Sequence, residues 1–412
     1  MGSGPPSDPR MRGFSRRTTV DDALRWISEN AARCEAETVS ILDCCGRTLA
    51  QDVTSRVNVP GFRRAMMDGY AIRAVDSEGA SAMNRLPVRI IGQVLPGEQS
   101  ELRLHSGEAI RIMTGAAAPE GCDCVIPVER TEKGDDDNQV FLVESLTPGK
   151  NVARVGEDIS ADNTVLTTGR VLRPQDVGVL SSIGVGEVSV VRQPRVRIVV
   201  TGNELLPPGS IPRDFQIVDA NSPMLAGLIQ RDGGLSQNPG IIPDNSAAIT
   251  EALHDDVDIV LVSGGSSVGQ EDFAPSLLAE HGDLAIHGIA MRPSSPAGMG
   301  TLGRRLVFLL PGNPVSCLCA YDFFAGQAIR LLGGRSPNWP YRSVQLPLRR
   351  KLISTVGRVD YARVQLIDDQ VEPLAISGAS VLSSTTRADG FIVIPSDSEG
   401  FPADQVVEVF LY

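Results

Sequence analysis

Hydrophobic and polar positions change their spacing twice along the chain. Behind the capping residue Thr19, apolar residues between 20 and 27 recur at helical spacing, which predicts a helix to about residue 35. From there to about residue 191 the apolar runs are short and broken by glycine and proline, as in residues 87–94, 109–113 and 140–146. This stretch is therefore predicted to be mostly β, in more than one module.

From residue 194 to about 337, buried strands are predicted to alternate with helices. The expected strands cover residues 195–200, 258–262 and 305–310, and the expected helices cover 223–231, 246–254, a stretch from about 274, and 315–332. Such alternation predicts right-handed βα units and a mostly parallel sheet, which binds ligands beyond the carboxyl ends of its strands. Beyond the linker 333–340, short strands ending in residues 406–411 predict a small β domain.

Length and charge narrow the class of protein. A chain of 412 residues exceeds what one core serves, so roughly two to four domains are expected. The net charge of −12 argues against a nucleic-acid partner, and no uninterrupted apolar run reaches the length of a bilayer helix, so no membrane span is predicted and the protein is placed in the cytoplasm. The seven cysteines and four histidines lack zinc-site spacing, which predicts reduced, apolar cysteines.

Three loops are predicted to leave the α/β sheet at one edge. Residues 201–205 (Thr-Gly-Asn-Glu-Leu) place Glu204 after a strand, although a polar loop is common there. Residues 263–269 (Ser-Gly-Gly-Ser-Ser-Val-Gly) offer backbone N–H groups and the hydroxyls of Ser266 and Ser267 to a phosphate, although a glycine-rich turn alone is more often structural. In residues 311–316 (Pro-Gly-Asn-Pro-Val-Ser), Pro314 suits the first helical position and Ser316 the first turn.

Two further positions lie outside this domain. Asp68 sits in an Asp-Gly turn within residues 66–71, where a purely structural turn is the plain alternative. Thr114 is expected at the end of a strand. The acidic residues 133–138 are predicted to form a solvated hairpin tip and not a calcium loop.

The order of the motifs carries more information than any one of them. From about residue 17 to 412, the sequence resembles the molybdopterin molybdenumtransferases, whose eukaryotic relatives include the gephyrin E domain. The resemblance rests on residues 60–62, 67–71, 111–115, 156–159, 201–205, 219–222 (Asp-Ala-Asn-Ser), 263–269 with Asp272, 311–316, 382–384 and 388–390.

The resemblance implies a multidomain α/β plus β fold and an elongated homodimer. After a flexible tail, residues 1–14, the implied domains are a discontinuous linker domain (15–57 and 149–193), an inserted β-rich domain (58–148), a molybdopterin-binding α/β domain with a central, mostly parallel sheet (194–337) and a C-terminal β-barrel-like domain (338–412). The active site would lie in a cleft shared by two subunits, and the molybdopterin adenylyltransferase is a candidate partner.

The resemblance also implies a reaction: insertion of molybdate into adenylylated molybdopterin, with Mg²⁺-dependent release of AMP. Family positions with functional acids, which would also hold the metal, match Asp68, Glu204, Asp244 and Asp272. Asp68 and Thr114 of one subunit would face Glu204 and Asp272 of the other. The implied substrate-binding residues are Gly264, Gly265, Ser266, Ser267, Gly269, Pro311, Gly312, Asn313 and Pro314.

The implied molybdate site departs from the family pattern. Where the family has a Lys-Pro-Gly-Lys-Pro segment, this chain has Arg-Pro-Ser-Ser-Pro at residues 292–296, so one lysine position is Ser295. The implied molybdate-binding residues are Arg292, Ser295, Ser316, Arg358, Arg363 and Ser380. The departure leaves a second hypothesis open, an impaired paralogue or scaffold that binds molybdopterin. A third hypothesis, adenylyltransferase activity of residues 194–337 alone, is disfavoured by the other domains.

Overall fold

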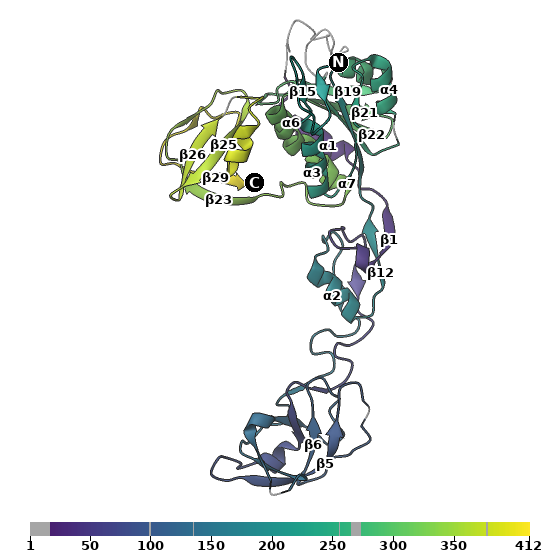
Figure 1. Ribbon diagram of the computed structural model, residues 1–412, viewed down its shortest axis with the longest axis vertical. Coiled ribbons are helices and arrows are strands. Elements are labelled where there is room, and N and C mark those ends of the chain that lie inside the picture. The colour runs from purple at the N-terminus through teal and green to yellow at the C-terminus, as the bar shows by residue number, and fades with distance from the viewer. Residues whose placement is uncertain (1–16, 99, 135, 255, 265–272, 376–377) are drawn as a thin grey trace. The chain divides into compact units, whose positions relative to one another are not determined.

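The computed structural model describes residues 17–98, 100–134, 136–254, 256–264, 273–375 and 378–412 (Figure 1). The chain folds as two compact units. The larger unit comprises Met1–Thr38, Gly46–Ala50 and Ser189–Tyr412, and the smaller comprises Val39–Cys45 and Gln51–Val188. The predicted tail 1–14 and five predicted site residues, Gly265, Ser266, Ser267, Gly269 and Asp272, lie outside the described residues.

The smaller unit is mostly β, as predicted. Its main sheet has the strand order β7-β4-β6-β5-β9-β8. The strands are β4 Gly69–Ile72, β5 Leu86–Val94, β6 Glu108–Ile112, β7 Cys124–Pro127, β8 Thr131–Lys133 and β9 Gln139–Leu142. Antiparallel pairing of β8 with β9 confirms a hairpin around the acidic stretch, although β9 ends four residues before the predicted strand.

The other elements up to residue 191 are short. Antiparallel pairs join β3 Arg64–Ala65 with β10 Val152–Ala153, and β2 Val53–Thr54 with β11 Thr164–Leu166. The strands β1 Ala36–Ser40 and β12 Glu187–Val191 form a further pair. The remaining elements are the helix α2 Pro174–Ser182 and the 3-10 turns η1 Ile41–Asp43, η2 Ala74–Ser77 and η3 Val128–Arg130.

The larger unit contains the predicted α/β sheet. Its strand order is β16-β13-β18-β22-β21-β19, with β17 also paired to β13. The strands are β13 Arg195–Thr201, β16 Leu235–Gln237, β17 Ile241–Ile242, β18 Ile259–Ser263, β19 Asp283–His287, β21 Gly298–Leu302 and β22 Arg305–Leu310. Strands β16, β17, β13, β18 and β22 run parallel, whereas β21 and β19 add an antiparallel edge that the sequence pattern did not predict.

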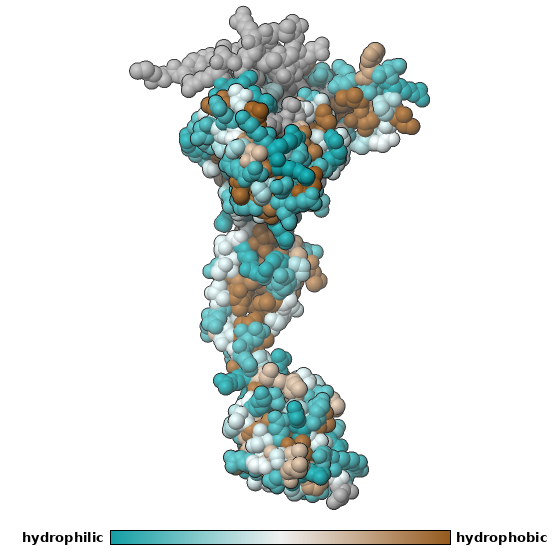
Figure 2. Space-filling view, turned by 90° about the vertical axis from the view of Figure 1, so that its left-hand side faces the viewer, coloured by the Kyte–Doolittle hydropathy of each residue, from teal (hydrophilic) through white to brown (hydrophobic). Residues whose placement is uncertain are grey.

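Helices cover both faces of this sheet because its strands are apolar on both faces. Val196, Ile198 and Val200 of β13 share a buried cluster with α1 Val20–Asn30, α3 Asn221–Arg231 and the helical stretch after β22. Val199 faces the other cluster, with α4 Ser246–Leu253 and α5 Phe273–His281. On the visible face in Figure 2, hydrophobic residues of this unit stand in small groups among hydrophilic ones.

The first helix is shorter than predicted. Thr19 caps it as expected, accepting a hydrogen bond from the Asp22 amide at 3.1 Å. The helix ends at Asn30 and not near residue 35, because the chain turns away to make tertiary hydrogen bonds, such as that from the Cys34 amide to the Leu332 carbonyl at 2.8 Å.

The long helix predicted over residues 315–332 is present. It consists of α6 Pro314–Ala320, a π-helical turn η4 Tyr321–Ala325 and α7 Gly326–Leu332. Among the described helices, Pro314–Leu332 is long and apolar enough to cross a membrane, but 89% of it is buried inside the protein. Burial also raises the pKa of the Cys317 thiol to about 12, so this cysteine packs as a small apolar residue.

The C-terminal β domain packs on the α/β domain within the larger unit. Its main sheet has the order β20-β25-β27-β29-β23, with β26 beside β25, and a second sheet pairs β24 with β28. The elements are β20 Met291–Arg292, β23 Arg342–Pro347, β24 Leu352–Ile353, β25 Val359–Ile367, β26 Gln370–Ala375, α8 Ser383–Arg387, β27 Gly390–Ile394, β28 Gly400–Phe401 and β29 Val406–Leu411. Because β20 lies in sequence between β19 and β21 of the α/β sheet, its pairing with β25 joins the two domains.

Candidate functional site

The three predicted loops do leave one edge of the α/β sheet. Val200 of β13 pairs with Ser263 of β18, and Ser263 pairs with Leu310 of β22, so these parallel strands end side by side. A Cβ added to Gly264 would lie 2.6 Å from the Thr201 carbonyl oxygen, and one added to Gly312 would lie 3.7 Å from the Gly264 Cα. The backbones of the three loops are therefore in close contact.

Asn221 ties this edge to the helix α3. Its Nδ2 donates to the Ser263 hydroxyl at 2.9 Å and to the Gly312 carbonyl at 2.8 Å. The Asp219 carboxylate accepts from the backbone amides of Asn221 and Ser222 at 2.9 and 3.0 Å and so fixes the start of the helix. The Oδ1 atom of Asn221 is buried and accepts no hydrogen bond within the described part of the chain. The sequence motif at 219–222 supported the family resemblance, but Asn221 was given no site role.

The remaining loop residues lie where the sequence placed them. Pro311 is buried at the end of β22, whereas Gly312 and Asn313 are exposed. Pro314 occupies the first turn of α6, as predicted, and Asn313 precedes it at the N-cap position without a side-chain capping hydrogen bond. The Asn313 amide is therefore not engaged in capping.

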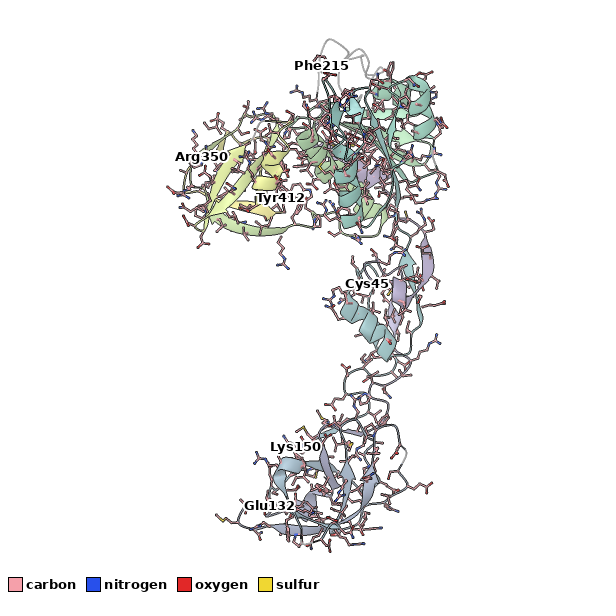
Figure 3. The ribbon with its side chains drawn as sticks, viewed as in Figure 1. Cys45, Glu132, Lys150, Phe215, Arg350 and Tyr412 are labelled. Carbon is pink, nitrogen blue, oxygen red and sulfur yellow. The ribbon has the colours of Figure 1, made fainter. Side chains whose placement is uncertain are left out.

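Two of the four predicted acids leave the same edge. Glu204 is exposed and follows β13, just before the short pair of β14 Leu205–Leu206 and β15 Ile217–Val218. Asp244 is half-buried and follows β17, whose residue Ile242 pairs with Thr201. Phe215, which precedes β15, is 95% exposed and marks this part of the surface in Figure 3.

The other two acids do not join them within the described parts. Asp272 is outside the described residues, and Asp68 belongs to the smaller unit. Among the residues that the structure describes, no three or more His, Cys, Asp or Glu side chains cluster closely enough to hold a metal ion. Of the predicted acids among the described residues, Glu204 and Asp244 are the two at this edge, so a metal held by them would also need further oxygen ligands.

Asp68 and Thr114 do lie together in the smaller unit. One carboxylate oxygen of Asp68 accepts hydrogen bonds from both the backbone amide and the hydroxyl of Thr114, each at 2.7 Å. These two bonds lower the pKa of the Asp68 carboxyl. Asp68 also borders a cavity of about 230 Å³ together with Tyr70 and Arg111. The arrangement holds an ionised carboxylate in a fixed orientation beside a hollow.

A second polar cluster lies where the α/β domain meets the C-terminal domain. Ser316 is buried in the first turn of α6, and its carbonyl accepts a hydrogen bond from the Ser294 hydroxyl at 2.5 Å. The neighbouring amide of Val315 donates to the Ala379 carbonyl at 2.9 Å, which places the exposed Ser380 beside the same turn. Ser295 follows Ser294 directly, so three segments far apart in sequence converge here.

The predicted molybdate arginines reach this cluster from two strands. Arg292 of β20 and Arg358 both form ion pairs with Asp360 of β25, Arg358 through its Nε at 3.2 Å. Arg363 lies further along β25 and is wholly buried, and its burial lowers the pKa of its guanidinium group. Asp360 was absent from the sequence-based site, because nothing local in the sequence shows which charges a buried strand residue will meet.

Several donors in this cluster have no acceptor. The Nε atoms of Arg292 and Arg358 and the hydroxyl of Ser295 are buried without a hydrogen-bond partner among the described residues. Leaving a buried donor unpaired costs about 1–3 kcal/mol. An oxyanion offers acceptors and negative charge together, which is what unpaired guanidinium and hydroxyl donors require. We call this cluster, comprising Arg292, Ser295, Ser316 and Arg358, the anion pocket.

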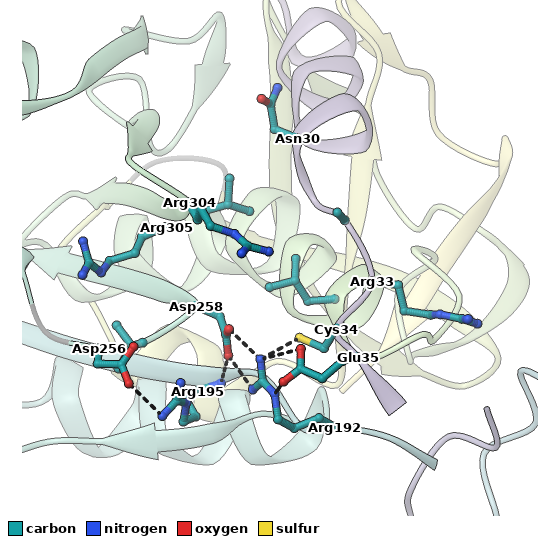
Figure 4. Close-up of a pocket in the computed structure, with 14 residues that line it drawn as sticks. Asn30, Arg33, Cys34, Glu35, Arg192, Arg195, Asp256, Asp258, Arg304 and Arg305 are labelled. Carbon is teal, nitrogen blue, oxygen red and sulfur yellow. Dashed lines mark hydrogen bonds and ion pairs between the residues drawn. The ribbon is translucent and has the colours of Figure 1, made fainter. Parts of the chain in front are cut away.

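Another cavity in the larger unit has a structural explanation. It measures about 490 Å³ and is bordered by the starts of β13, β18 and β22, at the opposite edge of the sheet (Figure 4). Arg192 there donates from two nitrogens to Asp258, each at 2.8 Å, and also pairs with Glu35. Arg305 donates to the His254 carbonyl at the end of α4. These arginines hold the chain together and cap a helix, so the cavity is not a candidate active site.

Gly264 offers a direct test of the loop contact. It has φ +100°, and an added Cβ would press on the Thr201 carbonyl. Gly264→Ala should therefore lower the free energy of unfolding by about 1–3 kcal/mol, measured by urea denaturation followed by tryptophan fluorescence. Gly227→Ala is the control, because a helical glycine with open space around it should be neutral or stabilising on substitution. Equal stability of the two variants would contradict the close approach of the loops.

Three family models match successive parts of the chain. Residues 18–184 match the MoeA N-terminal region (domain I and II), residues 197–330 match the model described as "Probable molybdopterin binding domain", and residues 345–412 match the MoeA C-terminal region (domain IV). Together these matches cover both units described above.

Individual relatives match over nearly the whole chain. A Methanocaldococcus jannaschii protein named for molybdopterin biosynthesis is 32% identical over 409 residues, covering 96% of each chain. Molybdopterin molybdenumtransferase 2 of Mycobacterium tuberculosis is 32% identical over 392 residues, covering 92% of this chain and 96% of its own. The crystal structure of the molybdopterin biosynthesis moeA protein from Pyrococcus horikoshii OT3 aligns with a TM-score of 0.81 at 29% identity, over 96% of this chain and 100% of that one.

Proposed function

Because the chain belongs to the MoeA family of molybdopterin biosynthesis proteins, we propose that it inserts molybdate into adenylylated molybdopterin, with Mg²⁺-dependent release of AMP. The observation that carries the proposal is the anion pocket, where Arg292 Nε, Arg358 Nε and the Ser295 hydroxyl lack acceptors among the described residues. A tetrahedral dianion supplies what these donors need. The enzyme would act as a cytoplasmic homodimer with the domain boundaries expected from sequence.

The edge of the α/β sheet suits the phosphate of the pterin substrate. Gly312 is exposed and Gly264 is half-buried, and Asn221 holds the two loops against each other. Glycine backbone N–H groups can bind phosphate without a positive side chain, which fits a chain of net charge −12. Phosphate recognition at this edge would therefore depend on shape and dipoles more than on charge.

Glu204 and Asp244 fit a magnesium ion at the same edge. Mg²⁺ is usually held by one or two carboxylates together with substrate phosphates and water. When bound, it would offset the negative charge that develops on phosphoryl oxygens as AMP departs. In a homodimer, the fixed carboxylate of Asp68 from one subunit would approach this edge of the other, with Thr114 keeping it ionised and oriented. Asp272 would complete the acidic set.

The proposed reaction has a direct assay. Purified protein is mixed with Mg²⁺, molybdate and adenylylated molybdopterin, and released AMP is measured by chromatography. We expect AMP release that requires both Mg²⁺ and molybdate. Absence of AMP from a folded, dimeric preparation would refute the transferase proposal, and binding of molybdopterin without turnover would favour the scaffold alternative. The molybdopterin adenylyltransferase, added as a candidate partner, should raise the rate if it delivers substrate.

One observation favours the impaired-paralogue alternative and gives it a test. Ser294 stands at the glycine position of the family segment and donates its hydroxyl to the Ser316 carbonyl, so it does not replace the donor lost where Ser295 stands in place of a lysine. If the native pocket with serine at position 295 already binds molybdate productively, Ser295→Lys should change kcat/KM for molybdate less than about threefold. If the pocket is impaired, one added charge-assisted hydrogen bond should raise kcat/KM at least about tenfold. Ser383→Lys on the exposed start of α8 is the matched control.

A further inference from the structure

Asp360 connects the two arginines of the anion pocket. It is completely buried, and its two carboxylate oxygens make different contacts. Oδ2 pairs with Arg292 Nη2 and accepts from the Ser354 hydroxyl at 2.7 Å, while Oδ1 lies 3.2 Å from Arg358 Nε. The backbone supports this geometry, because Arg292 and Asp360 are register partners in the parallel pair of β20 and β25. One acid from the C-terminal domain thus holds a cation from each side of the domain boundary.

Stability alone is a weak reason for this arrangement. A buried ion pair seldom stabilises a fold more than well-packed apolar residues do, because both charges must leave water. This pair is also incomplete, since the contact of Arg358 Nε with Asp360 lacks hydrogen-bond geometry and Arg292 Nε has no acceptor among the described residues. The carboxylate fixes the guanidinium groups without satisfying them. Donors therefore remain that no acceptor among the described residues satisfies.

The charge of Asp360 also limits how strongly the pocket attracts anions. Arg292, Arg358 and Arg363 contribute three positive charges around β20 and β25, and Asp360 subtracts one. In a partly buried site, a unit charge several ångströms from a ligand changes its binding severalfold. Asp360 therefore orients the arginines but weakens the attraction of the pocket for an anion.

We infer that Asp360 is a positioning residue for oxyanion binding: it holds Arg292 and Arg358 in place for the anion and weakens the affinity of the pocket in return. The inference rests on the proposed function in taking molybdate as the anion. Its consequence is a split between binding and turnover. Removing the charge of Asp360 should tighten the binding of molybdate and slow the transfer of molybdate to the substrate. The reason is that arginines held in place by Asp360 orient the anion, whereas arginines released from Asp360 only attract it.

The test uses full-length Asp360→Asn protein and molybdate alone as the probe. Equilibrium dialysis at low ionic strength should show a Kd for molybdate about 3–10-fold lower than that of the native protein. The affinity should also fall more steeply with added salt, because the pocket carries one more net charge. In the transfer assay, kcat should fall at least about tenfold although KM for molybdate decreases. A purely structural residue would lower the active fraction and leave KM unchanged.

Ser354→Ala is the second variant and keeps the carboxylate. Losing the Ser354 hydrogen bond leaves Asp360 more available to Arg292, so the Kd for molybdate should rise about two- to threefold. Asp360→Glu should restore part of the native kcat. Unchanged Kd values in both Asp360→Asn and Ser354→Ala would overturn the inference, and if Asp360→Asn does not fold, Ser354→Ala decides alone.

The outcome separates this inference from the transferase proposal. Opposite shifts of Kd in the two variants, with no AMP release from the native protein, would support the role of Asp360 and refute the transferase. AMP release by the native protein with identical molybdate affinity in all variants would support the transferase and refute the role of Asp360. Native protein that binds no molybdate by dialysis would refute the role of Asp360, and the AMP assay would still judge the transferase separately.

Discussion

The Glu204→Gln protein should release AMP at least about 100-fold more slowly than the native protein at saturating molybdate. Among the described residues, Glu204 and Asp244 are the predicted acids that lie at the carboxyl ends of the parallel strands. Loss of a carboxylate that holds the magnesium ion removes several kcal/mol of charge stabilisation in the transition state, and each 1.4 kcal/mol corresponds to about tenfold in rate. Stopped assays of AMP release over a range of Mg²⁺ concentrations measure the effect.

The control for Glu204 is Glu251→Gln on the helix α4 of the same domain. Glu251 is exposed and distant in sequence from the loops at the sheet edge, so its rate should stay within about twofold of native, as surface substitutions generally do. Excess Mg²⁺ should recover part of the activity of Glu204→Gln. A Glu204→Gln protein with native activity would remove this edge of the sheet from the catalytic site.

Replacing Asp232 by alanine should lower the free energy of unfolding of the larger unit by about 3–5 kcal/mol. Asp232 is almost fully buried at the end of α3 and accepts from Arg330 at 2.9 Å, from Arg231 at 2.8 Å and from the Tyr321 hydroxyl at 3.0 Å. Its removal would leave the buried Arg330 guanidinium without this counter-charge. The chain has two tryptophans, Trp26 and Trp339, and both belong to the larger unit, so urea unfolding followed by their fluorescence reports on that unit.

Asp256→Ala provides the comparison for Asp232. The Asp256 side chain is 92% exposed and pairs with Arg195 at 3.3 Å, so its removal should leave stability nearly unchanged. A similar loss of stability in both variants would show that the buried network around Asp232 contributes no more than a surface ion pair does.

Much of the central fold could be predicted because its signals are local. The runs at residues 195–200, 258–262 and 305–310 are mostly apolar on both faces after a charged first residue, which is typical of buried strands, and each is found as a strand. The alternation of these strands with helices implied that they pair in parallel. Parallel pairing in turn implied that the loops after the three strands meet at one edge of the sheet. Register partners Val200, Ser263 and Leu310 confirm that meeting.

The antiparallel edge was missed because its glycines suggest turns. Gly298 and Gly300 lie within β21, where glycine is normally unfavourable. A Cβ at Gly300 would lie 2.0 Å from the Asp283 carbonyl oxygen, so the close approach of β19 requires glycine there. Only the neighbouring strand reveals this need. The end of α1 was misplaced for a similar reason, because a distant partner, Leu332, draws the chain out of its helix.

Most residues of the candidate site could be predicted from the sequence, but the ion pairs and hydrogen bonds between them could not. Family motifs named Arg292, Arg358 and Ser316, and the structure brings these residues to one domain boundary. Asp360 and Asn221 were missed as functional residues because their importance comes from non-local contacts. An aspartate at a buried position of a largely apolar strand, as in β25, is a usable signal, since a fully buried acid is almost always paired.

A crystal structure of the protein with bound molybdate tests the central claim most directly. The account predicts anomalous density for one molybdenum atom within hydrogen-bonding reach of Arg292, Arg358, Ser295 and Ser316, at the boundary between the α/β and C-terminal domains. Density at another place, in crystals of a protein that releases AMP in a molybdate-dependent reaction, would contradict it.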